Sequence, residues 1–159
     1  MAAVTLGTEP TVESIAFTSQ GSNFWASPSK SRLLNTQYGI SPLNLSKRQR
    51  LDDILSTVNG LPFGGTDCAL PMLYALDKGM KVDHFVVYTD SETWAGDTHP
   101  AQALRRYRER TGISAKLTVV GMISNGFSIA DPSDASMLDV VGFDTAAPQL
   151  MADFAAGRL

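Results

Sequence analysis

Runs of apolar and polar positions divide the chain into short strands. Alternation along "TVESIAFTS" (Thr11–Ser19) predicts a first strand. Continuous apolar runs in "DHFVVYTD" (Asp83–Asp90) and "AKLTVVGM" (Ala115–Met122) predict two further strands, buried on both faces. Between residues 124 and 144, "MLDVVGF" is the segment with the most regular pattern.

Helical spacing and helix-end signals separate these strands. Residues 46–58 begin with a capping box and continue with apolar positions at helical spacing. A second helix has Pro71 in its first turn and ends at Gly79, and a third starts at Pro100. The last helix is expected from about Ala146 to Ala156. Helices of this length between strands are typical of right-handed crossovers.

This alternation predicts an α/β fold, a doubly wound and mostly parallel sheet with helices on both faces. Residues 20–44 are rich in Ser, Asn, Gly and Pro without a clear period, which predicts a long loop. In such sheets ligands bind at the carboxyl ends of the strands. Asp90 stands at such an end and is therefore a candidate site residue.

Composition and length indicate which classes of protein the chain can belong to. The 159 residues are enough for one core of ordinary size, and 43% hydrophobic with 18% charged residues is typical of a globular chain. The net charge of −3 does not indicate a nucleic-acid binder overall, although a local basic patch remains compatible with it. No apolar run reaches the roughly 18 residues of a membrane span. Cys68 stands alone and cannot form an internal disulfide, so the cytoplasm is the expected compartment.

Hard oxygen donors gather on two loops next to core elements. Such oxygens suit Mg²⁺, Ca²⁺ or Mn²⁺, and the glycine pair Gly64 and Gly65 would let the backbone approach an ion closely. The alternative is that Asp67 caps a helix and Asp90 caps a turn, with no metal bound. The candidate donors are Thr66, Asp67, Asp90, Ser91 and Glu92.

Two other features are candidate contact sites. Trp94 lies in a polar loop, where an exposed aromatic side chain often anchors a partner, but it can equally pack onto the sheet. An arginine cluster covers the helix face opposite Leu104 and Tyr107. It is suited to a phosphate backbone or an acidic partner, and the alternative is a solvated helix face. The cluster consists of Arg105, Arg106, Arg108 and Arg110.

Signals of catalysis are weak. The sequence has no Ser-His-Asp order, P-loop or dinucleotide fingerprint. His99 precedes Pro100 and is expected to start a helix, while His84 is expected to be structural. Cys68 is expected to be a small buried residue, because nothing nearby would lower its thiol pKa.

Three long strings resemble the carboxyl-terminal half of the Ro autoantigen, or TROVE-module, family of RNA-binding proteins. They are "PFGGTDCALPMLYAL", "FVVYTDSETWAGDTHPAQALRRYR" and "GMISNGFSIADPSDASMLDVVGFDT". The resemblance implies a von Willebrand factor A-like, Rossmann-like domain with a metal-ion-dependent adhesion site for Mg²⁺ or Mn²⁺. In that family a preceding ring of helical repeats binds small noncoding RNAs, including Y RNAs. Residues 1–159 are then one such domain, amino-terminally truncated and incomplete, with residues 20–44 as an insertion.

The family's metal motif is only partly matched. Thr66 of "GGTD" corresponds to its second part and Asp90 of "YTDSE" to its third. The first part, Asp-x-Ser-x-Ser at the end of a first strand, is absent, and the nearest string is "DPSDA" at Asp131–Ala135. In the family that strand lies between the strands predicted here near residues 12–18 and 84–89. Either a partner chain supplies it, or "AAVTL" near the N-terminus takes its place, or the chain is a poorly folding fragment.

These features lead to three alternative hypotheses for the function of this chain. The first is a non-catalytic binding module of a Ro-type ribonucleoprotein with a partial cation site at Thr66 and Asp90. In this function Trp94, Arg105, Arg106 and Arg108 are contact residues for RNA or a partner. The second is a truncated or split-gene product that needs a partner chain. The third is a metal-dependent phosphoester hydrolase or phosphotransferase using Asp90 and Glu92, for which no convincing base is visible.

Overall fold

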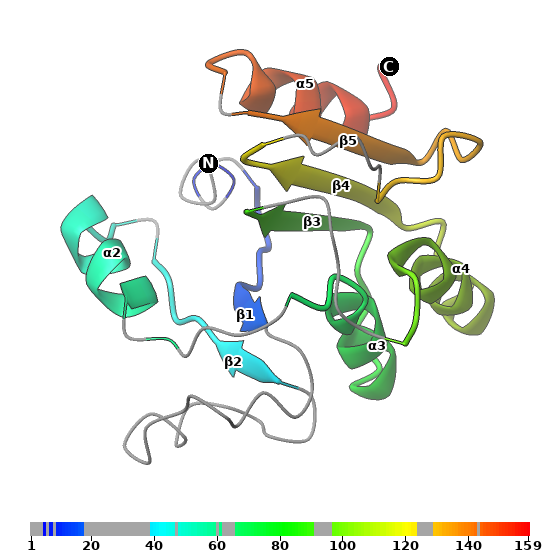
Figure 1. Cartoon of the computed structure of the whole chain (residues 1–159), viewed down its shortest axis with the longest axis horizontal. Coiled ribbons are helices and arrows are strands. Elements are labelled where there is room, and N and C mark those ends of the chain that lie inside the picture. Colours follow the sequence, from blue (N-terminus) through cyan, green and yellow to red (C-terminus); the bar gives the residue numbers. More distant parts are fainter. Residues whose placement is uncertain are drawn as a thin grey trace. The chain divides into compact units, whose positions relative to one another are not determined.

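The computed structural model divides the chain into two compact units, Met1–Asp67 and Cys68–Leu159. Each unit is described by itself, and Figure 1 shows the elements of both. The structure describes residues 5, 7, 9–17, 39–46, 48–59, 61, 66–90, 97–123, 129–142 and 144–159.

The first unit contains a short antiparallel strand pair and one helix. β1 (Ile15–Phe17) pairs with β2 (Ile40–Pro42) in the register Ile15 to Pro42, and α2 spans Leu51–Asn59. β1 is thus shorter than the strand predicted at Thr11–Ser19. The prediction of a loop over residues 20–44 is wrong at residues 40–42, which form β2, because pairing with β1 satisfies a backbone that shows no sequence period. The part of that loop between residues 20 and 38 lies outside the described residues.

The predicted capping box is displaced from the helix it was expected to start. The backbone N–H of Ser46 donates to Oε1 of Gln49 at 3.2 Å, and the N–H of Gln49 donates to the carbonyl of Ser46 at 3.0 Å. These bonds close a turn before Leu51, where α2 begins. The apolar face of α2 remains at the surface of this unit, with Leu51 and Leu55 exposed.

The second unit is an α/β structure around a three-stranded parallel sheet in the order β3-β4-β5. Its elements agree with the predicted strands and helices to within a few residues. Their order and bounds are α3 (Leu70–Asp77), β3 (His84–Thr89), α4 (Pro100–Thr111), β4 (Lys116–Gly121), β5 (Met137–Val141) and α5 (Ala147–Ala155).

Helices cover both faces of this sheet. The ring of Phe85 contacts Tyr107 of α4 edge to face, with 5.0 Å between the ring centroids. The ring of His84 contacts Phe154 of α5, with 5.9 Å between the centroids. Successive residues of a strand point to opposite faces, so α4 and α5 lie on opposite faces of β3. Figure 1 shows α3 and α4 together beyond β3 and α5 beyond β5. The predicted doubly wound arrangement is confirmed.

The ends of α4 follow the sequence signals closely. Nδ1 of His99 accepts a hydrogen bond from the N–H of Ala101 at 3.1 Å, so His99 is the N-cap of the helix, as predicted. Gly112 adopts φ of 72°, a left-handed conformation that favours glycine, and its N–H donates to the carbonyl of Arg108. Pro100 stands at the start, where its missing N–H costs little.

Burial differs between the two central strands. β4 is buried at every position from Leu117 to Gly121, as predicted for a strand covered on both faces. In β3 only alternate residues are buried, namely Phe85, Val87 and Thr89, and the others are half-buried. β3 is also the terminal strand of the sheet as far as the described residues show. Full burial on both faces was therefore a wrong prediction for β3, which over the described residues has a neighbouring strand on one side, β4.

No described helix is long and apolar enough to cross a membrane. Cys68, at the start of the second unit, is fully buried, as predicted.

Candidate functional site

Asp90 lies at the carboxyl edge of the sheet, directly after β3. Its side chain is exposed, and the Thr89 hydroxyl lies 3.5 Å from its Oδ1. The N–H of Met122 donates to the carbonyl of Thr89 at 3.1 Å, which keeps the ends of β3 and β4 level. The parallel strands thus present Asp90 where open sheets place their ligands.

Thr66 and Asp67 precede α3. Thr66 is half-buried, while Asp67 is only 8% exposed. The N-cap of α3 is Ala69, so Asp67 is not the N-cap residue of this helix. Thr66 belongs to the first unit and Asp90 to the second, and their joint binding of a cation stays a prediction.

The chemistry of the predicted donors fits a hard cation, although their number is small. A carboxylate and a hydroxyl with several waters is a ligand set that Mg²⁺ accepts. Over the described ranges, no group of three or more His, Cys, Asp or Glu side chains is placed to hold a metal. The other predicted features of this site lie outside the described residues, namely Gly64, Gly65, Ser91, Glu92 and Trp94.

The arginine cluster on α4 divides into two kinds of residue. Arg105, Arg106 and Arg110 are exposed, and the Arg105 side chain keeps 67% of its surface accessible. Arg108 is half-buried and serves the fold: its Nε donates to the carbonyl of Ala115 at 2.7 Å. The Arg108 guanidinium is therefore less available to bind RNA or another partner than the guanidinium groups of the three exposed arginines.

The other bond of Arg108 ties α4 to the crossover between β4 and β5. Its Nη1 donates to Oδ2 of Asp134 at 2.5 Å. Burial raises the pKa of Asp134, but the hydrogen bonds from Arg108 and Ser136 lower it more, so the carboxyl pKa lies below its ordinary value. The ion pair therefore remains charged at neutral pH and fixes the crossover against the helix.

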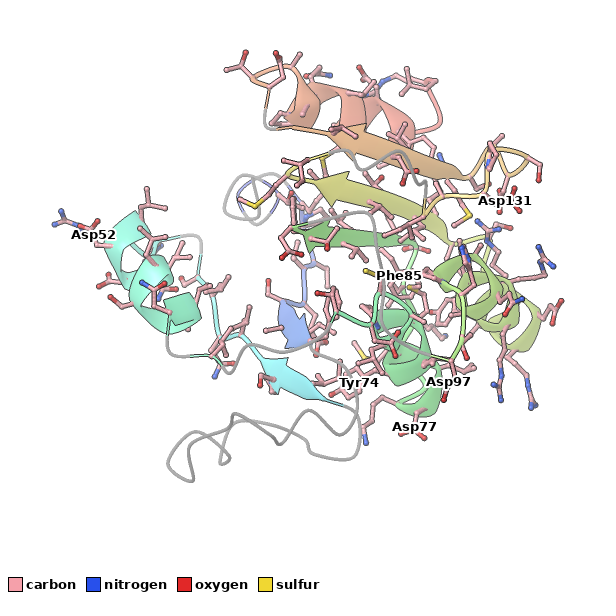
Figure 2. The ribbon with its side chains drawn as sticks, in the orientation of Figure 1. Asp52, Tyr74, Asp77, Phe85, Asp97 and Asp131 are labelled. Atoms are coloured by element: carbon pink, nitrogen blue, oxygen red, sulfur yellow. The ribbon has the colours of Figure 1, made fainter. Side chains whose placement is uncertain are left out.

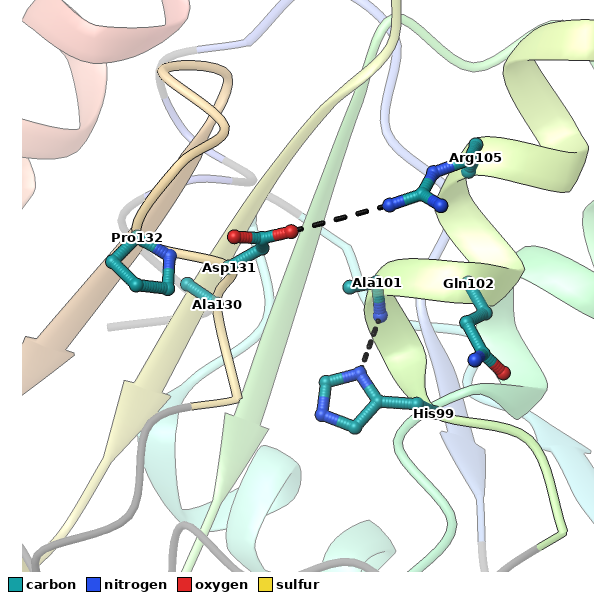
Figure 3. Close-up of a pocket in the computed structure, with 7 residues that line it drawn as sticks. All are labelled: His99, Ala101, Gln102, Arg105, Ala130, Asp131 and Pro132. Carbon is teal, nitrogen blue, oxygen red and sulfur yellow. Dashed lines mark hydrogen bonds and ion pairs between the residues drawn. The ribbon is translucent and has the colours of Figure 1, made fainter.

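A cleft of about 350 Å³ opens where α4 starts, beside the segment that leads into β5. Figure 3 shows Asp131 and Arg105 facing one another above the ring of His99. This cleft is not predictable from the sequence, in which "DPSDA" has only a similarity to a metal motif. No spacing rule in the sequence predicts that residues 130–132 lie beside α4, because β4 separates the two segments along the chain. Its lining residues are His99, Ala101, Gln102, Arg105, Ala130, Asp131 and Pro132.

His84 has a structural role, as predicted. Its Nε2 lies 2.8 Å from the hydroxyl of Thr118 on β4. Burial, with a smaller contribution from the charge of Lys116, lowers its imidazole pKa from 6.5 to about 4. Nζ of Lys116 in turn donates to the carbonyls of Phe154 and Ala155 at the end of α5. The cluster anchors α5 to the sheet.

Together, the parallel sheet, the helices on both faces and the acid at its carboxyl edge define an A-domain-like α/β binding fold. The family described as the Ro60 vWA domain matches residues 1–155. The chain therefore belongs to the Ro60 von Willebrand factor A domain family, and the resemblance found in the sequence is confirmed.

Individual relatives agree with this family. The chain is 50% identical over 118 residues to the "RNA-binding protein RO60" of Deinococcus radiodurans, covering 74% of this chain and 22% of that protein. It is 46% identical over 121 residues to the "RNA-binding protein RO60" of Caenorhabditis elegans, covering 76% of this chain and 19% of that protein. The chain thus spans about a fifth of the length of these relatives.

A solved structure has the same fold. The crystal structure of the Deinococcus radiodurans RO (RSR) protein superposes with a TM-score of 0.80 at 41% sequence identity. The match covers 99% of this chain and 28% of that one.

Proposed function

We propose that this chain is a non-catalytic binding module of a Ro-type ribonucleoprotein that works with RNA in the cytoplasm. The observation that carries the proposal is its similarity to two proteins named RNA-binding protein RO60. A binding role needs no nucleophile or base, and the family relationship supports binding over turnover. Small noncoding RNA, similar to Y RNA, would be held mainly by an associated helical-repeat module.

The exposed arginines of α4 are the proposed RNA contact of this chain. Arg105, Arg106 and Arg110 provide a local basic face on a chain whose net charge is −3. Guanidinium groups pair with phosphates in a bidentate manner and release counterions from the RNA backbone. Such contacts position an RNA without reading its sequence.

Arg106→Glu is expected to weaken binding of a labelled single-stranded RNA heptamer, rA7, measured by fluorescence anisotropy. Losing one phosphate contact should reduce the slope of log K against log salt by about 1. Arg158→Glu is the charge-matched control, since it makes the same change in an exposed residue at the C-terminus. Equal loss of affinity in both variants would count against a contact on α4.

We further propose that Asp90 binds a divalent cation, Mg²⁺ or Mn²⁺, at the carboxyl edge of the sheet, and Thr66 stays a predicted second ligand from the family's motif. The donor chemistry and the exposure of Asp90 support this site. The ion would carry positive charge to which an acidic group of a partner can bind. Only two of the family's ligands are present in the 159 residues, so the affinity of this chain alone is expected to be low.

Millimolar Mn²⁺ is expected to raise the melting temperature of the chain, followed by tryptophan fluorescence. A cation that binds only the folded state stabilises it by mass action. Asp90→Ala should make the melting temperature insensitive to Mn²⁺, while Asp83→Ala, an exposed acid just before β3, should keep the response. An Mn²⁺ response that survives Asp90→Ala would contradict the assignment.

We also propose that a strand carrying Asp-x-Ser-x-Ser completes the cation site. β3 is the terminal strand of its sheet over the described ranges, and a further strand carrying Asp-x-Ser-x-Ser beside it would bring three more ligands toward Asp90. A peptide with an apolar strand ending in that motif should increase the Mn²⁺-induced shift. A peptide of the same length with the Asp and both Ser replaced by Ala is the control, and an equal effect of both peptides would count against complementation.

A further inference from the structure

The cleft beside α4 has the volume of a small recognition site. Its volume of about 350 Å³ lies near the lower end of the range for small-molecule sites, roughly 300–1,000 Å³. All of its lining residues belong to the second unit, and they are His99, residues of the first half of α4 and residues 130–132. Figure 3 shows the polar ends of Arg105 and Asp131 toward one side of the cleft and the His99 ring toward the other.

Both signs of charge meet in this cleft. Nη2 of Arg105 lies 4.0 Å from Oδ2 of Asp131, too far for a direct hydrogen bond between the two. Two bonds from Ser133, its N–H at 2.9 Å and its hydroxyl at 2.6 Å, orient the carboxylate through Oδ1. Oδ2 faces Arg105, and both residues line the cleft.

This arrangement argues against simple ions. Asp131 would repel a phosphate, and Arg105 would repel a metal cation. The first turn of α4 does not offer a backbone anion site either: the N–H of Ala101 donates to Nδ1 of His99 and the N–H of Gln102 donates to the carbonyl of His99. A neutral ligand with acceptors and donors on adjacent edges fits the cleft better than either ion.

We propose that this cleft receives one unpaired guanine base, an inference that rests on the proposed RNA-binding function. Guanine presents O6 and N7 acceptors to a guanidinium and N1–H and N2–H donors to a carboxylate. Adenine has a donor, its N6 amino group, where guanine has the O6 acceptor. That donor cannot accept a hydrogen bond from Arg105. The His99 ring offers a face on which a splayed base can stack.

The surroundings favour a base within an RNA strand. Arg106 and Arg110 are exposed on the same helix, where they can meet the phosphates that flank the base. A free nucleotide has the same base without those flanking phosphates. A guanine in an RNA strand is therefore expected to bind more tightly than a free guanine nucleotide, because the flanking phosphates add contacts to the arginines.

The test compares two labelled heptamers, rAAAGAAA and rAAAAAAA, by fluorescence anisotropy with the 159-residue chain. The guanine heptamer is expected to bind about tenfold more tightly, since a good bidentate pair discriminates by roughly 1–3 kcal/mol. Replacing the guanine by inosine removes the N2 donors to Asp131 and should lose most of this ratio. Asp131→Asn should bring the ratio of the two dissociation constants close to one, because asparagine still accepts from Ser133 but places an amide near the base.

Arg110→Ala is the matched control, since this exposed residue does not line the cleft. It should weaken both heptamers alike and leave their ratio unchanged. Binding of both heptamers with equal affinity overturns the guanine site and leaves the proposed function standing. Absence of any RNA binding overturns both the guanine site and the proposed RNA contact on α4. If GMP alone binds as tightly as the guanine heptamer, the cleft serves a free nucleotide and the RNA form of the inference is wrong.

Discussion

Replacement of Tyr107 by alanine is expected to lower the free energy of unfolding by about 3–5 kcal/mol, the cost of removing a large aromatic ring from a core. Tyr107 is fully buried on α4. Its ring packs edge to face on Phe85, which Figure 2 shows between the sheet and the helices α3 and α4. The alanine variant loses this contact and leaves a cavity at the centre of the second unit.

Tyr107→Phe separates the hydroxyl from the ring. The hydroxyl donates to the carbonyl of Met80 at 2.6 Å and accepts from the N–H of Val82 at 2.8 Å. Phenylalanine keeps the packing but removes the partner of both backbone groups, which should cost about 1–3 kcal/mol. Urea denaturation measures both variants. Arg106→Ala, an exposed change on the same helix, should stay within about 0.5 kcal/mol of the parent. A phenylalanine variant as stable as the parent would show that these bonds do not contribute.

Lowering the pH from 6.5 to about 4 is expected to remove about 2–3 kcal/mol of stability through His84. Its imidazole pKa is lowered from 6.5 to about 4 by burial and by Lys116, so between these values the unfolded chain binds more protons than the folded one. Stability therefore rises with pH across this window. It is lost as the pH falls, because protonation must charge a half-buried ring bonded to Thr118.

Urea denaturation at several pH values from 7.5 to 4.5 measures this dependence. His84→Gln should keep a polar partner for Thr118 and flatten the curve in this window. Acids contribute in a lower range: hydrogen bonds hold the carboxyl pKa values of Asp131 and Asp153 below their ordinary value of 3.8, so their contribution is lost only near and below that pH. An equal slope between pH 6.5 and 4.5 in the parent and His84→Gln would refute the assignment.

Local patterns were sufficient to predict most elements of the second unit. Apolar runs located β3 and β4, and the His99-Pro100 start and the Gly112 end located α4, because helix ends and strand periods depend on neighbours in sequence. The pattern failed for β2, which has three residues and is held by pairing with β1. A strand that short has no period to detect.

The candidate sites depended more strongly on tertiary structure. Asp90 was predictable, since a strand end is a local feature and open α/β sheets bind ligands there. The division of the arginine cluster was not, because Arg108 is engaged by Asp134, a residue 26 positions away.

The sequence alone thus determined the order of strands and helices in the second unit, the family and the acid at the end of β3. Only the tertiary structure decided that α4 and α5 cover opposite faces, that Arg108 serves the fold and that Arg105 meets Asp131 across a cleft. The reason is physical. Hydrophobic period and capping report each segment's own conformation, whereas contacts between segments depend on sheet register and on the path of the crossovers.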